Sequence, residues 1–492
     1  MVEIVIYTLK IAVLSTLIAA LIGIPLAFFT ARRTFHGRRF ILSLSAIPLC
    51  IPPLIIALGY VSFFGMNGTV NNLAKSLFHL QDSPFKFLYS LRGIVIAQGF
   101  YNFPLITGVL SAAWKQLPRE EENAARLLGT SEPRIFITIT LKQLSGAIAA
   151  ACIPVFLFCF FSFMIVLLFS PVGKSTIEVE IYHSIRTTLD IKNGAILAIL
   201  ETLLSLSFVA IYSFICRKSQ TNSNGISFSK NPAYKLCRFP YQTKGQKLLE
   251  GIIFALLILL VFLFLLCPGL AILLNSQFSR IFKDKIFFQA LKNTIWIGLC
   301  TSSGCCLISF IYSALVKMNK KEGSIFLQTL PLIPTAISSV VLAWCMSMIF
   351  HHGNPALLIF MEIFLYWPIA YRQIQNGMNR LSPDICNAAR LLSKNKLDAI
   401  LRVYLPSCKK VIFTAFGLCF AVSAGDSTLP LVLSIPRFNT LAYYTYKLAG
   451  AYRFKQACAS GSVLTVLCCI IFALCRTNRW QKKEIKCIYE KN

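Results

Sequence analysis

Long apolar stretches constrain the fold of this chain more than any other feature of its sequence. Eleven of them follow one another along the 492 residues. The hydrocarbon core of a bilayer is about 30 Å thick and takes roughly 20 mostly apolar residues per helix. The sequence therefore predicts an all-α polytopic membrane protein with about eleven transmembrane helices. The stretches are residues 4–31, 40–65, 92–115, 146–170, 194–216, 250–274, 291–316, 326–350, 357–376, 408–432 and 457–475.

The basic residues predict the orientation in the membrane. The formal net charge is +29, but Lys and Arg gather in short runs between the apolar stretches. Such runs mark cytoplasmic loops, so we interpret them as topology signals and not as a nucleic-acid surface. They predict an external N-terminus and a cytoplasmic C-terminus. The runs are Arg32, Arg33, Arg38 and Arg39; Lys317, Lys320 and Lys321; and Arg476, Arg479, Lys482, Lys483, Lys486 and Lys491.

A polar segment in the middle of the chain predicts a boundary between two membrane halves. Residues 217–249 carry seven basic and no acidic residues, with a core rich in Ser, Asn and Gly. This composition is typical of a linker, here a cytoplasmic one. We therefore expect a first half at 1–216, a second half at 250–475 and a basic cytoplasmic tail at 476–492.

An internal repeat relates the two halves. The hexapeptide at 123–128 (NAARLL) recurs letter for letter at 387–392. Duplication explains this better than chance, because the same register holds well outside the hexapeptide without a gap. In that register Pro104 matches Pro368, Leu117 matches Leu381 and Leu141 matches Leu405. Further upstream, Ile47-Pro48 resembles Leu330-Pro331, Pro52 resembles Pro334, and Thr8 resembles Thr294.

Both copies of the hexapeptide are expected in cytoplasmic loops, at 119–143 and 383–407. Their mixed polar and apolar pattern at helical spacing predicts a short helix outside the bilayer. The Ala-Ala pairs would give each helix a flat surface suited to docking. Gly129 can end the first helix, and Pro406 interrupts the second copy.

These loops resemble the EAA loops of ABC importer permeases. Glu122, Ala124, Ala125, Gly129 and Leu141 carry the resemblance in the first loop, and Ala388, Ala389, Ser393, Leu405 and Pro406 carry it in the second. The second loop departs from the pattern at Cys386, where Glu is expected, and at Ser393, where Gly is expected. The first departs at Lys142, in place of Pro. The resemblance implies a type I ABC importer permease fold and a coupling role for both loops, with the first the more sensitive.

The resemblance also implies the partners. They are a cytoplasmic ABC ATPase, expected as a homodimer, which uses ATP and Mg, and an extracytoplasmic solute-binding protein that docks around 171–193 and 433–456. The chain itself would bind no cofactor, touch lipid and reside in a bacterial inner membrane. Such fused permeases usually have six spans per half, and this chain begins where the second span would be expected, which accounts for the odd number of stretches.

The segments that follow the loops resemble those of thiamine importer permeases. In the first half these are Phe161–Phe163, Val166-Leu167 and Thr176–Tyr182, and in the second Gly425-Asp426, Thr440-Leu441, Tyr444, Tyr446 and Ala451–Arg453. The resemblance implies import of thiamine or a phosphorylated form. Iron permeases share parts of the pattern, so ferric iron is the alternative substrate. A secondary transporter driven by an ion gradient, which can also show a repeat and buried acids, is the alternative from another class.

Three acidic residues, Glu201, Glu362 and Asp426, fall within or at the ends of apolar stretches. A carboxylate in lipid is costly and usually faces the bundle interior or an aqueous cavity. Each could line the pathway of a cationic solute, or could make a structural hydrogen bond between helices.

Two motifs are weaker than they first look. Gly173–Thr176 resembles the end of a phosphate-binding loop, but Leu168 stands where the pattern requires another glycine. His351-His352 has no carboxylate or third histidine close in sequence, which favours a polar loop over a metal site. The sequence thus predicts neither a catalytic nor a metal site, and the eighteen cysteines contain no C-x-x-C pair.

Overall fold

The computed structural model describes residues 1–44, 50–171, 173–223, 234–235, 244–318, 327, 330–350 and 353–476. These residues form two compact units. Unit 1 comprises Met1–Pro48 and Ile56–Asn275, and unit 2 comprises Leu49–Ile55 and the described residues from Ser276 onward.

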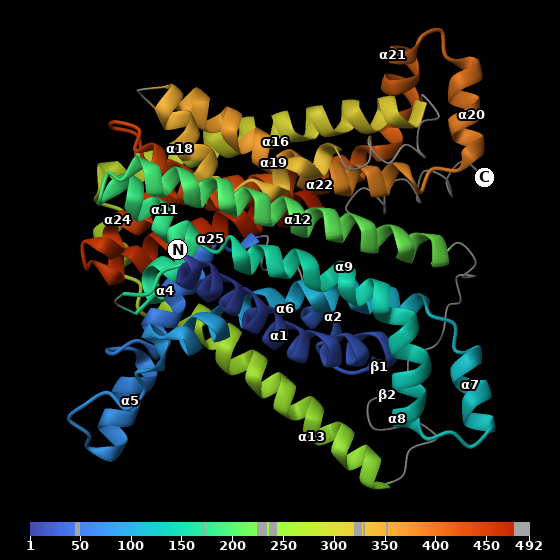
Figure 1. The fold of residues 1–492 in the computed structure, drawn as a ribbon, viewed down its shortest axis with the longest axis horizontal. Coiled ribbons are helices and arrows are strands. Elements are labelled where there is room, and N and C mark those ends of the chain that lie inside the picture. Colours follow the sequence, from blue (N-terminus) through green and yellow to red (C-terminus); the bar gives the residue numbers. More distant parts are fainter. Residues whose placement is uncertain are drawn as a thin grey trace. The chain divides into compact units, whose positions relative to one another are not determined.

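Unit 1 is almost entirely helical (Figure 1). Its elements are α1 (Val2–Arg32), β1 (Arg33–Thr34), α2 (Arg38–Leu44), α4 (Pro53–Phe64, which begins in unit 2), α5 (Thr69–Phe78), η1 (Phe87–Tyr89), α6 (Leu91–Gln116), α7 (Glu120–Leu127), α8 (Glu132–Ile135), η2 (Phe136–Thr140), α9 (Leu141–Phe160), α10 (Met164–Phe169), α11 (Ile177–Arg186), α12 (Ile191–Ser223), β2 (Tyr234–Lys235), α13 (Lys244–Val261), η3 (Phe262–Leu266) and α14 (Cys267–Leu274). The two-residue strands β1 and β2 pair in parallel.

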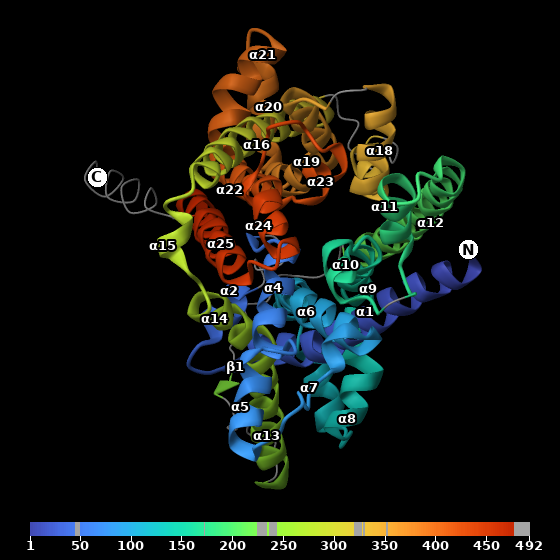
Figure 2. The ribbon, with the colours of Figure 1, turned by 90° about the vertical axis from the view of Figure 1, so that its left-hand side faces the viewer.

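Unit 2 repeats much of this order. Its elements are α15 (Phe278–Ile281), α16 (Lys285–Met318), η4 (Leu330–Ala336), α18 (Ser339–Ile349), α19 (Pro355–Met378), α20 (Pro383–Leu392), α21 (Lys396–Ala399), η5 (Ile400–Tyr404), α22 (Leu405–Gly425), α23 (Thr428–Leu433), α24 (Leu441–Gly450) and α25 (Phe454–Arg476). Helices α16, α19 and α22 pack side by side and are seen nearly end-on in Figure 2.

The described residues contain ten helices long and apolar enough to cross a membrane, or eleven if one bent pair counts as a span. This agrees with the fold predicted from the apolar stretches. The bent pair is η4 and α18, which meet at 89°. Pro331 and Pro334 lack backbone N–H groups, and Ser338 caps the new helix by accepting from the amide of Val340 at 3.1 Å. The expected straight helix at 326–350 is therefore bent. The expected stretch at 40–65 is likewise divided, between α2 and the span Pro53–Phe78.

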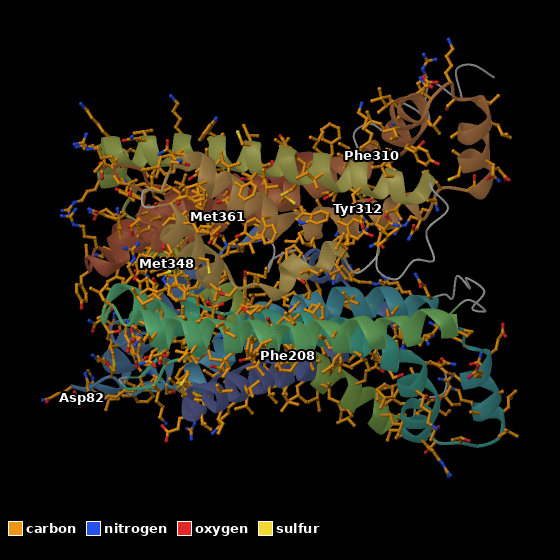
Figure 3. The ribbon with its side chains drawn as sticks, turned by 45° about the horizontal axis from the view of Figure 1, so that its top comes forward. Asp82, Phe208, Phe310, Tyr312, Met348 and Met361 are labelled. Carbon is orange, nitrogen blue, oxygen red and sulfur yellow. The ribbon has the colours of Figure 1, made fainter. Side chains whose placement is uncertain are left out.

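Small residues bring the central helices of unit 1 together. A Cβ atom on Gly23 of α1 would lie 2.9 Å from the side chain of Ile106, and one on Gly99 of α6 would lie 2.6 Å from that of Ile18. Only glycine permits this approach, as is common between membrane helices. Aromatic rings join other pairs: Phe208 of α12 packs on Phe156 of α9 at 4.8 Å between centroids (Figure 3).

Unit 2 also uses aromatic packing between its long helices. Tyr312 of α16 lies edge-on to Trp367 and Tyr371 of α19, with centroids 5.9 and 5.6 Å apart (Figure 3). Prolines fit at helix starts: Pro355 opens α19, where Asn354 accepts from the amide of Leu357 at 2.7 Å.

The two units share details that follow the repeat. Thr8 Oγ1 accepts from the amide of Ile177 at 3.0 Å, and Thr294 Oγ1 accepts from the amide of Leu441 at 2.7 Å. Ile177 and Leu441 are equivalent in the register of the hexapeptide, and so are the π-helical segments η2 and η5. The duplication therefore extends to individual hydrogen bonds.

The first long helix after the polar segment packs against the first half of the sequence. Residues 250–275, assigned to the second half, pack in unit 1. Arg33 Nε lies 2.6 Å from Glu250 Oε1, and Tyr60 donates to the carbonyl of Phe264 at 2.6 Å. The ring of Phe264 stacks on Phe100 at 4.6 Å. The expected linker is also shorter, because α12 extends to Ser223 and α13 begins at Lys244.

Candidate functional site

The first coupling loop, residues 119–143, starts with a short helix that has well-defined ends. Glutamates occupy the first turn of α7, where negative charge is favourable. The helix ends at Gly129, whose φ of +77° lies in the left-handed region. Its amide donates to the carbonyl of Arg126 at 3.0 Å, and the amide of Thr130 donates to that of Ala125 at 3.1 Å. Glycine accepts this conformation without a steric penalty, so Gly129 acts as the helix stop.

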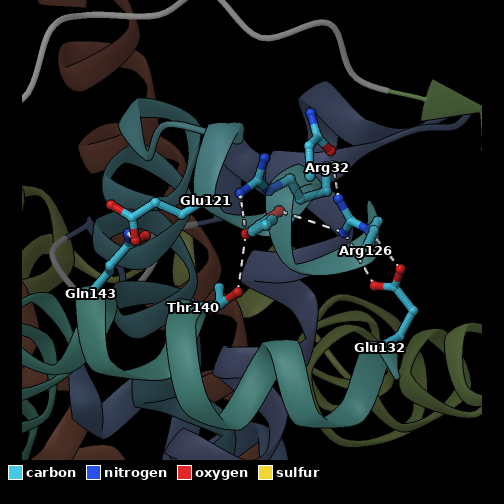
Figure 4. A network of polar contacts seen from close by, with 8 residues as sticks. Arg32, Glu121, Arg126, Glu132, Thr140 and Gln143 are labelled. Atoms are coloured by element: carbon cyan, nitrogen blue, oxygen red, sulfur yellow. Dashed lines mark hydrogen bonds and ion pairs between the residues drawn. The ribbon is translucent and has the colours of Figure 1, made fainter. Parts of the chain in front are cut away.

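Glu122 holds α7 against the rest of unit 1 (Figure 4). It is buried, and its carboxylate lies 2.9 Å from Arg32 Nη2 at the end of α1 and accepts from Thr140 Oγ1 of η2 at 3.0 Å. Arg126 lies 3.7 Å from the same carboxylate and pairs with Glu132 at 2.6 Å. Glu122 therefore faces inward, and its role within this unit is to fix the loop to α1 and η2.

The C-terminal end of α7 exposes two leucines. Leu127 is 90% exposed and Leu128 is 85% exposed, and both lie outside every candidate span. Ala124 is also exposed, and Ala125 is half-buried. Sequence reasoning assigned the docking face to the alanines and did not consider the exposed leucines. The leucine pair ends both copies of the hexapeptide, and this repetition could have drawn attention to it.

The second coupling loop, residues 383–407, is anchored by apolar contacts. Cys386, which corresponds to Glu122, is 4% exposed, and Ala389 is 3% exposed. Both belong to a core cluster that includes Met378, Tyr404 and Cys408. Ala389 thus packs inside unit 2, whereas Ala388 is exposed.

The outer end of this loop repeats the leucine pair. Leu391 and Leu392 are each 84% exposed. α20 then ends at Ser393, which has an extended backbone with φ −83° and ψ 137°. Any residue can adopt that conformation, which explains why serine suffices here while the first loop needs Gly129.

The remaining loop residues lie where the coupling loops rejoin the long helices. Leu141 and Leu405 each open a helix after a π-helical segment, and their exposed fractions are 36% and 37%. Pro406 lies in the first turn of α22. In the first loop, Gln143 of α9 donates to Glu121 at 2.7 Å (Figure 4).

Glu201 differs from the other intramembrane acids. It is fully buried in α12, and neither carboxyl oxygen has a hydrogen-bond partner among the described residues. Glu178 of α11 is also fully buried and close enough for the two charges to repel. Sequence reasoning did not identify Glu178 as part of such a pair, since most of α11, a loop and the first turns of α12 lie between the two residues in the sequence.

Glu362 and Asp426 belong to a satisfied network in unit 2. Glu362 Oε2 accepts from Thr301 at 2.8 Å and from Ser423. Asp426 accepts from the hydroxyl of Tyr366 at 2.8 Å and from the amide of Thr428 at 2.7 Å, at the start of α23. These carboxyls join α16, α19, α22 and α23.

The repeat gives this network a neutral counterpart. The register that aligns the two hexapeptides also pairs Glu362 with Gln98 and Asp426 with Ser162. Gln98 is fully buried in α6. An uncharged amide therefore occupies the position of Glu362 in the other half. His351 and His352, considered above as a weak metal motif, lie outside the described residues.

Comparison with known proteins identifies the family. The binding-protein-dependent transport system inner membrane component family matches residues 23–218 and again residues 252–478. The two matches fall on the two halves of the repeat.

Full-length relatives agree with this match. The chain is 26% identical over 478 residues to the thiamine transport system permease protein of Escherichia coli strain K12, covering 94% of this chain and 86% of that protein. It is 25% identical over 496 residues to the protein of the same name from Brucella abortus strain 2308, covering 97% and 88%. A putative 2-aminoethylphosphonate transport system permease of Salmonella choleraesuis is 25% identical over 216 residues, covering 44% and 76%. The chain thus belongs to the family of inner-membrane components of binding-protein-dependent transport systems, as a multi-pass ABC importer permease with two fused halves.

Proposed function

We propose that this permease imports thiamine or a phosphorylated form of it, on ATP hydrolysis by a partner subunit. The observation that supports thiamine as the substrate is the similarity to proteins named thiamine permeases. This similarity extends over 94–97% of the chain and both halves. Ferric iron remains the alternative substrate. Membership of a binding-protein-dependent family weighs against the alternative of a secondary transporter driven by an ion gradient.

Uptake measurements test the substrate. The permease is reconstituted in liposomes with its ATPase and binding protein, and the uptake of labelled thiamine is compared with that of labelled ferric iron. We expect ATP-dependent thiamine uptake that stops when ATP is replaced by a non-hydrolysable analogue. Iron uptake without thiamine uptake would overturn the substrate and leave the family unchanged.

The two leucine pairs support the coupling proposal. Leu127, Leu128, Leu391 and Leu392 are each at least 84% exposed, on short helices outside the candidate spans. Leaving leucine in water costs about 1.5–3 kcal/mol relative to full burial. We infer that the pairs dock in grooves on the cytoplasmic ATPase, a homodimer with one groove for each loop. Glu122 and the Cys386 cluster would hold the helices so that ATPase movement reaches the spans.

Glu201 is the best-supported candidate for the solute pathway. Thiamine is a cation. Glu201 has two buried carboxyl oxygens, and neither forms a hydrogen bond with a described residue. The carboxyls of Glu362 and Asp426 already accept hydrogen bonds from neighbouring helices. We therefore propose a solute contact for Glu201 and structural roles for the other two.

The orientation and the remaining partner complete the proposal. The coupling loops would face the cytoplasm, with the N-terminus outside and the C-terminus inside. The solute-binding protein would dock at the opposite ends of the spans, around 171–193 and 433–456. ATP and Mg would bind the partner ATPase, with no cofactor on this chain.

A further inference from the structure

A cavity of about 590 Å³ lies within unit 1 beside the first coupling loop. The ends of α1 and α6, the loop helices and the first part of α13 line it. Helix α13 runs obliquely to α1 (Figures 1 and 2). None of the roles proposed above uses this cavity.

Part of the cavity lining is apolar and rich in aromatic rings. It includes Phe28, Trp114 and Phe136, together with aliphatic residues of α1 and α13. The rings of Trp114 and Phe136 stack at 6.1 Å, and Phe28 lies edge-on to Trp114 at 5.5 Å. These apolar side chains fit a hydrocarbon.

The lining also carries four arginines and three glutamates, and Arg33 lies over the ring of Phe28 at 5.0 Å. Arg32, Arg33, Arg119 and Arg126 face Glu122, Glu132 and Glu250. Four ion pairs form among them, at 2.9 Å for Arg32–Glu122, 2.6 Å for Arg33–Glu250 and Arg126–Glu132, and 3.7 Å for Arg126–Glu122. Four positive charges against three negative ones leave a net charge of +1, and the charges of Arg33, Arg119 and Arg126 repel that of Arg32. An anion would relieve this repulsion.

The cavity lies at the level where four spans begin or end. The spans Val2–Arg32 and Leu91–Gln116 finish here, and Glu132–Phe160 and Lys244–Leu274 begin here. The outer surface of α13 beside it is apolar and exposed: Leu249 is 58% exposed, Ile252 56% and Leu256 54%. An acyl chain that leaves the cavity can therefore continue along α13.

We propose that this cavity binds the headgroup and upper acyl chains of an anionic phospholipid. The phosphate would lie against the arginines and the glycerol and first methylenes against Phe28 and Trp114, because an amphipathic anion matches a lining that carries both arginines and aromatic rings. The bound lipid bridges α13 and the first coupling loop and so supports the position of Glu122. The choice of the cytoplasmic leaflet rests on the orientation proposed above, but the binding itself does not.

Native mass spectrometry of the purified full-length permease in detergent tests the proposal. The protein is equilibrated with equimolar phosphatidylglycerol and phosphatidylcholine, and the bound copies of each are counted. Ile253 lines the cavity, whereas Ile199, an exposed residue of α12, does not. We expect wild type and Ile199→Trp to retain phosphatidylglycerol equally and Ile253→Trp to retain about tenfold less, the effect of losing one good contact.

A second pair of variants tests the charge. Arg119→Gln removes a cavity arginine, and Arg134→Gln removes an exposed arginine of the adjacent helix α8 that does not line the cavity. The preference for phosphatidylglycerol over phosphatidylcholine should fall in the first and persist in the second. The melting temperature of each variant in lipid-free detergent checks that the fold is intact.

Two results would overturn the proposal. One is equal phosphatidylglycerol retention by Ile253→Trp and wild type. The other is displacement of the lipid by glycerol phosphate at the same concentration, which would assign the cavity to a soluble phosphate ester. Because the assay contains no ATPase, binding protein or thiamine, its outcome is independent of the proposed transport function.

Discussion

At the scale of single residues, the two coupling loops are fixed to their units by different kinds of contact. Glu122 ties the first loop to Arg32 through a buried ion pair. In the second loop, Cys386 packs into an apolar cluster. The register that pairs Thr8 with Thr294 pairs Arg32 with Met318, so the arginine and the glutamate are both replaced by apolar residues. A buried charge needs its partner, which explains why the two positions differ together.

Exchanging these residues tests the anchor. Glu122→Cys leaves Arg32 buried without its carboxylate, and breaking a buried pair from one side costs about 3–5 kcal/mol. We expect a clear fall in the melting temperature of the purified permease. The double variant Arg32→Met with Glu122→Cys should recover part of the loss. Recovery would be incomplete because Thr140 and Arg126 also contact Glu122. A double variant less stable than Glu122→Cys would contradict the anchoring role.

The buried acids give a second prediction at this scale. Glu201→Gln keeps the size of the side chain and removes its charge, so thiamine uptake should fall about 10- to 100-fold, the worth of one charged contact. Glu362→Gln is the matched control, because Gln98 occupies the equivalent position in the other half. We expect Glu362→Gln to retain uptake within a fewfold of wild type. Equal effects of the two substitutions would remove the distinction between pathway and structural carboxyls.

At the scale of elements, the short helices α7 and α20 show how far the sequence could predict this site. The repeat located both helices, and the expected helix stop at Gly129 is confirmed by its positive φ. The direction of each side chain could not be predicted, because it depends on the rotation of a short helix against distant segments. Ala389 therefore turned out buried, and an acidic residue there would disrupt unit 2 before it reached a partner.

The exposed leucine pairs lead to a prediction about ATPase binding by these helices. Leu127→Ser with Leu128→Ser, or Leu391→Ser with Leu392→Ser, should weaken ATPase binding by about 100-fold or more, since each leucine buried is worth roughly 1.5–3 kcal/mol. Leu397→Ser is the control, because Leu397 is 71% exposed on α21, beyond the docking helix. Titration of the ATPase against the permease in nanodiscs measures the effect. Unchanged affinity in both double variants would show that the loops dock by other residues.

At the scale of the whole chain, the apolar stretches predicted an all-helical protein with ten or eleven spans but not the packing partners of the spans or their bends. Residues 250–275 follow the polar linker, so the sequence assigns them to the second half, yet they pack in unit 1. Packing of Phe264 on Phe100 and the Arg33–Glu250 pair join segments far apart in the chain, which no local pattern reveals. The bend of 89° between η4 and α18 follows Pro331 and Pro334. The sequence alone does not tell whether prolines at these positions bend a span.

That bend decides the topology of the second half, which gives the last prediction. Each span crossed reverses the side, so both coupling loops face the cytoplasm only if η4 and α18 together cross the membrane, making eleven spans from an external N-terminus. If they do not cross, ten spans place the second loop and the C-terminus outside. A reporter active only outside the cytoplasm should therefore be silent when fused after Lys394 or after Asn492. Fusion after Leu189, in the exposed turn between α11 and α12, should be active and serves as the positive control. Activity after Lys394 and Asn492, with silence after Lys115 at the end of α6, would show that η4 and α18 enter and leave on the same side, and ATPase docking at the second loop would then be excluded.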